Sequence, residues 1–195
     1  MQAPNDLNAE FANYCSRVLQ PDSAFAEYAN EISSGRGLWE GPDPDPALTP
    51  SEVIALTLFA LRHNDEPAPH TGAATLRRFS TPDFVLAGMP TAPWAPQALS
   101  ALLSSPASQY NLLLQDYELS LPSDTVFADE RHCFQEVQID ALGGGPMLAK
   151  LGWELERSEA PEQRGCWLTC SVAWQDFRDG FRPGIGREEW TRAYG

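Results

Sequence analysis

The stretch HCFQEVQIDALGGGPMLAKLGWELE, residues 132–156, decides the fold. Apolar side chains alternate with polar ones in both halves, through Val137 and Ile139 in the first and every second residue of 147–155 in the second. A period of two is typical of a strand that buries one face. Because the glycine-rich segment 143–146 separates the halves, the stretch predicts two antiparallel strands joined as a hairpin.

Helical signals precede this hairpin. Thr49 and Glu52 form a capping-box pattern around Pro50, which predicts a helix over about residues 50–63. This segment is apolar around most of its girth, so we expect it to be buried against the sheet. A further short helix is expected at 95–103, continued over 108–114.

The remaining segments complete the expected order of elements. Residues 80–90 begin with Ser, Thr, Pro and Asp and are expected to hold one helical turn. Residues 165–174 alternate as a further strand. Helices followed by antiparallel strands predict an α+β domain, in which helices pack on a curved antiparallel sheet, over residues 49–174.

Two arms flank this domain in the sequence. Residues 1–48 are expected to form a helical extension, with two short helices within 5–33, and a linker; residues 175–195 form a C-terminal tail. Both arms carry large aromatic residues, which should pack on the domain or on a partner. The N-terminal arm is acidic like the domain, so we expect it to be the better candidate for partner contact.

The charge of the chain narrows the classes of partner. Its 195 residues include 27 acidic and 13 basic residues, for a net charge of −14. This balance argues against nucleic acid and anionic membranes as partners and favours a basic protein. No apolar run approaches the roughly 18–20 residues that span a bilayer. The N-terminal residues lack a signal sequence, so an imported form is expected to have lost its targeting segment.

The stretch RHNDEPAPHTG, residues 62–72, contains the densest group of reactive side chains. In a structural interpretation, Asn64 ends the helix, Pro67 stops its continuation, and the acidic residues bond turn amides. In a catalytic interpretation, Asp65 is a base and His70 is its partner. The sequence favours the structural interpretation, because Pro67 and its neighbours favour an extended surface course.

Metal and disulfide sites are not expected. The three histidines are scattered, without HxH or HExxH spacing, and His132 falls on the polar face of its strand. Cys166 and Cys170 lie about 13 Å apart on a strand, too far for a disulfide or a shared metal ion. No cofactor motif is present either, since Gly143–Gly145 precedes neither Lys nor a helix.

Several ordered motifs resemble one superfamily. These are Asn64-Asp65-Glu66-Pro67, Gly72, Arg78-Phe79, Tyr110 and Trp167-Leu168-Thr169. Over residues 49–173 the chain is similar to the nuclear-transport-factor-two-like (cystatin-like) superfamily, and within it to an uncharacterised plant and algal chloroplast family. The resemblance implies a cone-shaped sheet around a central cavity, in the chloroplast, with the cytoplasm as the alternative.

Two functions follow as expectations. The favoured one is a non-catalytic protein-interaction or accessory module, associated with a chloroplast complex and compatible with a homodimer. In the alternative, the cone cavity binds a small apolar molecule or performs isomerase or dehydratase chemistry. Tyr110, Trp153 and Trp167 would then line the cavity, with Asp65 or His70 as the acid or base.

Overall fold

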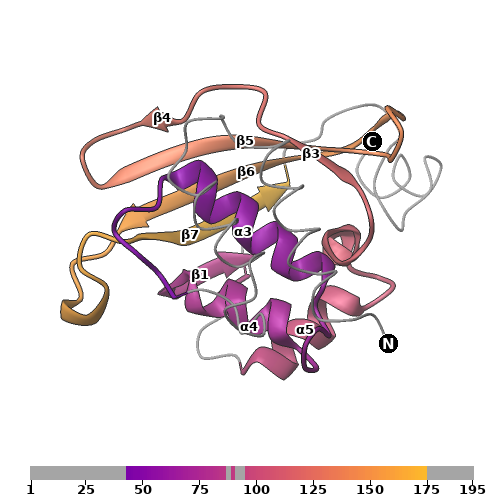
Figure 1. The fold of residues 1–195 in the computed structure, drawn as a ribbon, viewed down its shortest axis with the longest axis horizontal. Helices are drawn as coiled ribbons and strands as arrows, with labels where there is room; N and C mark the ends of the chain where they lie inside the picture. Colours follow the sequence, from indigo (N-terminus) through magenta and orange to yellow (C-terminus); the bar gives the residue numbers. More distant parts are fainter. Residues whose placement is uncertain (1–42, 87–88, 91–94, 175–195) are drawn as a thin grey trace, which may run out of the picture.

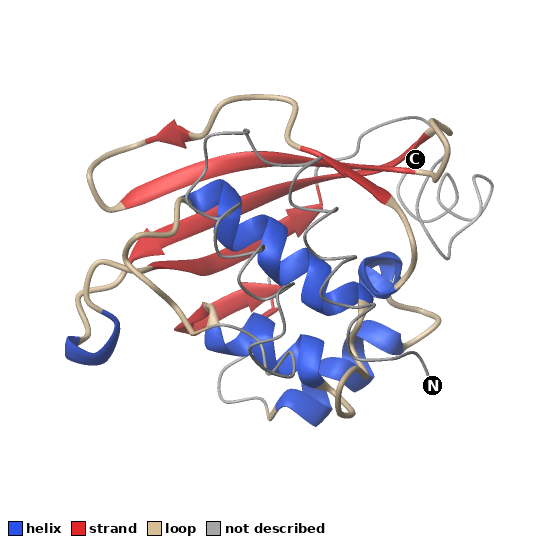
Figure 2. Cartoon of the chain, viewed as in Figure 1, coloured by secondary structure: helices blue, strands red, loops and turns tan. Residues whose placement is uncertain are grey.

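A computed structural model of the chain describes residues 43–86, 89–90 and 95–174 (Figure 1). The expected helices within 5–33, the C-terminal tail and Cys15 lie outside the described residues. Within the described part, helix α3 lies across one face of the sheet, the helical segments between residues 71 and 114 gather beside its C-terminal half, and a short helical turn at 161–163 lies apart from them (Figure 2).

Helix α3, Pro50–Arg62, confirms the predicted helix to within one residue. Its capping box is complete, since the Thr49 hydroxyl accepts a hydrogen bond from the Glu52 amide at 3.4 Å and Glu52 Oε2 accepts one from the Thr49 amide at 2.6 Å. Every residue of 53–61 is buried. The helix is therefore enclosed on all sides, as expected for a helix that has apolar residues around most of its circumference.

Three other helical segments follow α3 along the chain. They are α4 (Thr71–Arg78), α5 (Pro96–Ser104) and the 3-10 helix η1 (Gln109–Leu114). The segments α5 and η1 confirm the helical expectation for residues 95–114. Helix α4 was not predicted, because it is short and follows a turn whose prolines suggested an extended course.

One mixed sheet carries the strands. Its order is β2-β1-β7-β6-β5-β3, with β4 paired to β5 beside β3. The strands are β1 (Ser80–Leu86), β2 (Met89–Pro90), β3 (Glu118–Ser120), β4 (Val126–Phe127), β5 (His132–Asp140), β6 (Met147–Arg157) and β7 (Trp167–Trp174); a short 3-10 helix, η2 (Pro161–Gln163), precedes β7.

Strands β5 and β6 confirm the predicted antiparallel hairpin. Val137 pairs with Leu151 and Ile139 with Ala149, and all four side chains are buried. Strand β7 continues the antiparallel arrangement, with Val172 opposite Trp153. The alternation in the sequence therefore corresponds to the face of the sheet that packs on α3.

The expectation of a helical turn at residues 80–90 is wrong. Residues 80–86 form β1, which runs parallel to β7, with Ser80 opposite Thr169. The Thr169 amide donates to the Phe79 carbonyl at 2.7 Å, so the edge of β7 supplies the hydrogen bonds that this segment needs. One parallel pair thus joins a sheet that was expected to be antiparallel throughout.

The α+β class is confirmed by this arrangement of helices on a curved, mostly antiparallel sheet. The largest fully buried side chains include Trp153, Tyr117, Phe59, Phe79 and Phe84, which lie in one hydrophobic core. Among the helices within the described residues, none has the length and apolar character needed to cross a membrane.

Candidate functional site

Asn64 ties together the turn that follows α3. Its side-chain Oδ1 accepts a hydrogen bond from the Ala73 amide at 3.1 Å, and its Nδ2 donates to Ser100 Oγ and to Asp65 Oδ1, each at 3.0 Å. Its backbone carbonyl accepts from the Gly72 amide at 3.1 Å. A buried amide with all these partners fixes the turn against both α4 and α5.

Asp65 bonds the backbone of His70. Asp65 Oδ1 accepts a hydrogen bond from the His70 amide at 3.0 Å. His70 itself has φ 66°, a left-handed conformation, immediately before α4. The carboxylate therefore has the turn-stabilising contact of the structural interpretation. The His70 ring nitrogen Nδ1 is buried and has no hydrogen-bond partner among the described residues.

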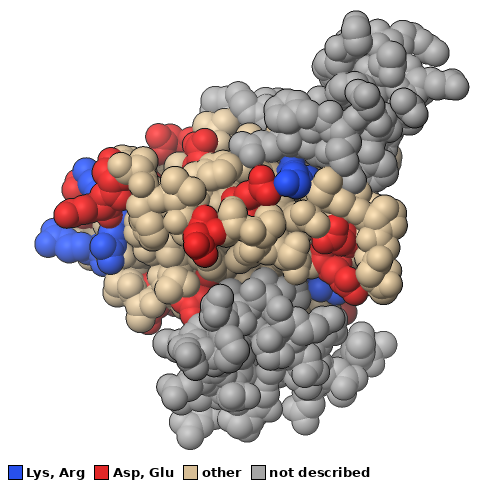
Figure 3. Space-filling model, turned by 90° about the horizontal axis from the view of Figure 1, so that it is seen from above, with Lys and Arg blue, Asp and Glu red and all other residues tan. Residues whose placement is uncertain are grey.

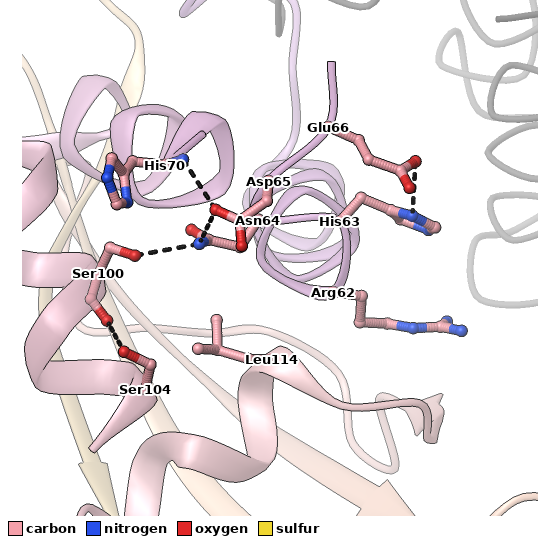
Figure 4. A pocket seen from close by; sticks show the side chains of 9 residues that line it. All are labelled: Arg62, His63, Asn64, Asp65, Glu66, His70, Ser100, Ser104 and Leu114. Carbon is pink, nitrogen blue, oxygen red and sulfur yellow. Dashed lines mark hydrogen bonds and ion pairs between the residues drawn. The ribbon is translucent and has the colours of Figure 1, made fainter. Parts of the chain in front are cut away.

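A pocket of about 350 Å³ opens beside this turn (Figure 4). Asp65 and His70 line it, together with two serines of α5, Ser100 and Ser104. The complete set of described residues that line the pocket is Arg62, His63, Asn64, Asp65, Glu66, His70, Ser100, Ser104 and Leu114. The two serines were not singled out from the sequence, because the predicted helix ended at residue 103; in α5 their spacing of four residues places them on one face.

The charged residues of this pocket are partly paired. Arg62 Nη2 lies 3.3 Å from Asp116 Oδ1, and its guanidinium carbon lies 5.3 Å from the centre of the Tyr117 ring. His63 Nδ1 lies 3.8 Å from Glu66 Oε2. Burial raises the pKa of Tyr117, although the nearby Arg62 charge lowers it, so this phenol stays neutral at physiological pH.

Gly72 sets how closely α4 approaches α3. A Cβ atom at this position would lie 2.3 Å from the Ala60 carbonyl oxygen. We therefore expect Gly72→Ala to lower the free energy of unfolding by about 1–3 kcal/mol, as overpacking does elsewhere. Urea unfolding followed by circular dichroism measures this change.

The sign of the Gly72→Ala effect is diagnostic. At a helix position with free space, the same substitution stabilises by up to about 1 kcal/mol, because alanine has the higher helix propensity. Ala74→Gly, two residues along the same helix, is the matched control and should cost about 1 kcal/mol. Stabilisation by Gly72→Ala would show that the two helices do not meet as closely as described.

The three aromatic residues expected to line a cone cavity are all buried in the one hydrophobic core. Trp153 is fully buried, and its Nε1 donates to Thr169 Oγ1 at 2.9 Å. The Tyr110 hydroxyl donates to the Val172 carbonyl at 3.4 Å, whereas Trp167 lies at the other end of β7, roughly 16 Å away at 3.3 Å per residue. None of the three lines the pocket beside Asp65 and His70.

The described cysteines are free and poorly reactive. Cys133, Cys166 and Cys170 form no disulfide, which confirms that Cys166 and Cys170 do not pair. Burial raises the pKa of Cys133 to about 12 and that of Cys170 to about 11. Because the thiolate is the nucleophile, these thiols are not candidates for nucleophilic catalysis at neutral pH.

His132 lies on the surface, as its position on the polar face predicts. Its Nδ1 is 3.0 Å from Asp129 Oδ2, and this contact, with backbone hydrogen bonds, lowers the pKa of Asp129. Within residues 43–86 and 95–174, no group of three or more His, Cys, Asp or Glu side chains is placed to hold a metal ion.

Strand β4 exposes two adjacent apolar side chains. Val126 is 59% exposed and Phe127 56% exposed, although Phe127 also packs 5.8 Å from the Trp167 ring, centre to centre. The sequence signal for this feature was a short apolar pair within the polar stretch 121–131, which was not singled out. We call Val126 and Phe127 the β4 patch.

Comparisons with known proteins do not assign this chain to a family. The resemblance to the nuclear-transport-factor-two-like superfamily stays a proposal, which depends on the motifs quoted above and on the order of the elements. No family model, no curated protein and no solved structure matches the chain.

Proposed function

We propose that this protein is a non-catalytic interaction module whose β4 patch docks a basic protein. The observation that carries the proposal is the exposure of Val126 and Phe127, consecutive residues of one short strand whose side chains point to its two opposite faces. Large apolar side chains that are left exposed to water favour burial against another surface. Leu142, the other large apolar side chain that is strongly exposed among the described residues, lies elsewhere, in the β5–β6 turn.

The edge of β4 offers backbone groups as well. Val126 pairs with Phe134 and Phe127 with Cys133, so β5 covers one side of β4. Among the described residues, no strand pairs with its other side. An unpaired strand edge beside apolar side chains is the arrangement to which an extended partner segment adds a strand.

Acidic residues flank the β4 patch in the sequence. These are Asp124, Asp129 and Glu130, all of which are exposed. The nearby cation Arg131 contacts Glu156 at 3.1 Å and Glu159 at 2.9 Å. Figure 3 looks down on the molecule from this side, and acidic side chains recur across the described surface there. This charge supports a partner that presents basic residues.

The contacts that the candidate residues already make within the protein also support a non-catalytic role. Trp153 is packed in the core and hydrogen-bonded, and the Asp65 carboxylate is engaged with backbone and amide groups of its own turn. We propose in addition that the curved sheet around α3 belongs to the nuclear-transport-factor-two-like superfamily. The chloroplast as compartment follows only from that resemblance.

Site-specific photocrosslinking tests the docking proposal. A photoreactive phenylalanine analogue replaces Phe127 in one variant and Leu142 in the control, and both are exposed to an extract of the source cells. We expect a discrete crosslink to a basic protein from position 127 and none from position 142. Unlabelled protein should suppress this crosslink, whereas the unlabelled double variant Val126→Ser/Phe127→Ser should not.

The competing variants keep the test independent of folding. Both positions are more than half exposed, so the double substitution should leave circular dichroism spectra and the thermal midpoint nearly unchanged. Equal crosslinking from positions 127 and 142, or equal competition by the folded double variant, would rule out the β4 patch as the docking site.

A further inference from the structure

We infer that the pocket at the end of α3 binds a protonated primary amine carried on a short carbon chain. The pocket lies where the α3–α4 turn, α5 and η1 meet, and its volume of about 350 Å³ is at the lower end of the range for small-ligand sites. This inference is separate from the docking proposal, because the pocket contains no residue of the β4 patch.

Hydrogen bonds within the protein already hold several of the residues that line the pocket. Asn64 holds Ser100 through its Nδ2 atom and α4 through its Oδ1 atom. Asp65 is held at Oδ1 by two hydrogen bonds, from Asn64 and from the His70 amide. Groups that are already fixed in this way lose little freedom when a ligand binds, which favours affinity.

The fixed charge beside the turn is negative. No ion pair engages Asp65 among the described residues, and its two recorded hydrogen bonds reach only Oδ1. Arg62, the cation that also lines the pocket, contacts Asp116 at 3.3 Å instead. The Asp65 charge therefore faces the pocket region without a cation paired to it, and a ligand that brings a positive charge would complement it.

The neighbouring polar groups accept hydrogen bonds. The Ser104 hydroxyl donates to the Ser100 carbonyl at 2.7 Å, which leaves its oxygen lone pairs as acceptors. The His70 ring lines the same pocket, whereas its Nδ1 atom is itself buried and has no hydrogen-bond partner among the described residues. An ammonium group has three hydrogen-bond donors and no acceptor, so it complements the Asp65 carboxylate and the Ser104 hydroxyl oxygen, both of which can accept.

The pocket also has an apolar element for the rest of the ligand. Leu114, at the end of η1, lines it opposite the polar turn (Figure 4). An alkyl chain of a few carbons can lie against this side chain while its ammonium group reaches Asp65. A free amine and the lysine side chain of a peptide share this chemistry, so the experiment has an arm for each.

Titration of the full-length protein with cadaverine tests the inference. Backbone amide NMR signals of residues 64–72 and 100–104 are followed, and 1,5-pentanediol, which has the same carbon chain but no charge, is the matched ligand control. We expect saturable shifts with a Kd of about 1 mM for cadaverine, as for a small ligand with few contacts, and much weaker shifts for the diol. Nα-acetyl-lysine amide forms the second arm.

Asp65→Asn isolates the charge. The asparagine oxygen can still accept from the His70 and Asn64 groups, so the turn should remain, but the charge is lost. We expect the affinity for cadaverine to fall about tenfold, the size of one lost charge-assisted contact. The matched control Asp124→Asn, at an exposed position outside the pocket, should bind as the unmodified protein does.

The possible outcomes separate clearly. Binding of cadaverine but not of the lysine derivative assigns a free amine, and the reverse assigns a peptide lysine. The inference is overturned if neither ligand gives saturable shifts at these amides, if Asp65→Asn binds as tightly as the unmodified protein, or if the diol binds as well as the diamine.

Discussion

Replacing Trp153 with alanine is expected to lower the free energy of unfolding by about 3–5 kcal/mol, the usual cost of deleting a buried aromatic side chain. Trp153 is fully buried in the middle of β6, between Gln135 of β5 and Val172 of β7. The substitution removes its packing contacts and leaves the Thr169 hydroxyl without the indole donor at 2.9 Å. Urea unfolding of the full chain, followed by circular dichroism, measures the loss.

Two companion measurements show whether packing is the cause. Trp153→Phe keeps most of the ring volume and should cost less than the alanine change. Indole added to Trp153→Ala should raise its thermal midpoint, because an apolar cavity of matching shape binds the missing ring. A loss below about 1 kcal/mol would instead show that the side chain lines open space, which would favour the cone-cavity function.

Leu56→Ala is expected to lower the free energy of unfolding by about 2–5 kcal/mol. Leu56 is fully buried in α3, a helix whose residues 53–61 are enclosed on all sides. The surrounding elements cannot collapse easily into the space left by the removed methyl groups, so the cost includes a cavity. The same urea unfolding experiment measures this change.

Leu142→Ala is the matched control for Leu56→Ala. It makes the same chemical change at a position that is 57% exposed in the β5–β6 turn, so it should alter stability by less than about 0.5 kcal/mol. A Leu56→Ala loss as small as that of the control would mean that α3 does not pack as the structure describes.

Local patterns account for the elements that the sequence predicts correctly. The capping box at Thr49 and Glu52 places the start of α3, because a cap depends on residues three apart. The alternation in 132–156 specifies which side chains of β5 and β6 face the core, because a strand turns successive side chains to opposite faces. Both signals are complete within a few residues.

The misassigned segment 80–86 depended on a distant partner. Its Ser, Thr, Pro and Asp residues are compatible with a helix start, and nothing within the segment decides between the two conformations. Ser80 finds its strand partner in Thr169, and the pairing with β7 supplies the hydrogen bonds. Long-range pairing therefore overrides the local preference.

For the candidate site, the sequence by itself determined that α3 ends in a turn near Asn64, but it favoured an extended course after Pro67 and so did not bring Asp65 and His70 together. Only the tertiary structure decided that Ser100, Ser104 and Leu114 complete a pocket beside them, and that Val126 and Phe127 remain exposed while Trp153 is enclosed. The physical reason is that a turn is specified by neighbouring backbone groups, whereas a pocket or an exposed patch depends on which distant elements pack against each other and which surfaces they leave uncovered.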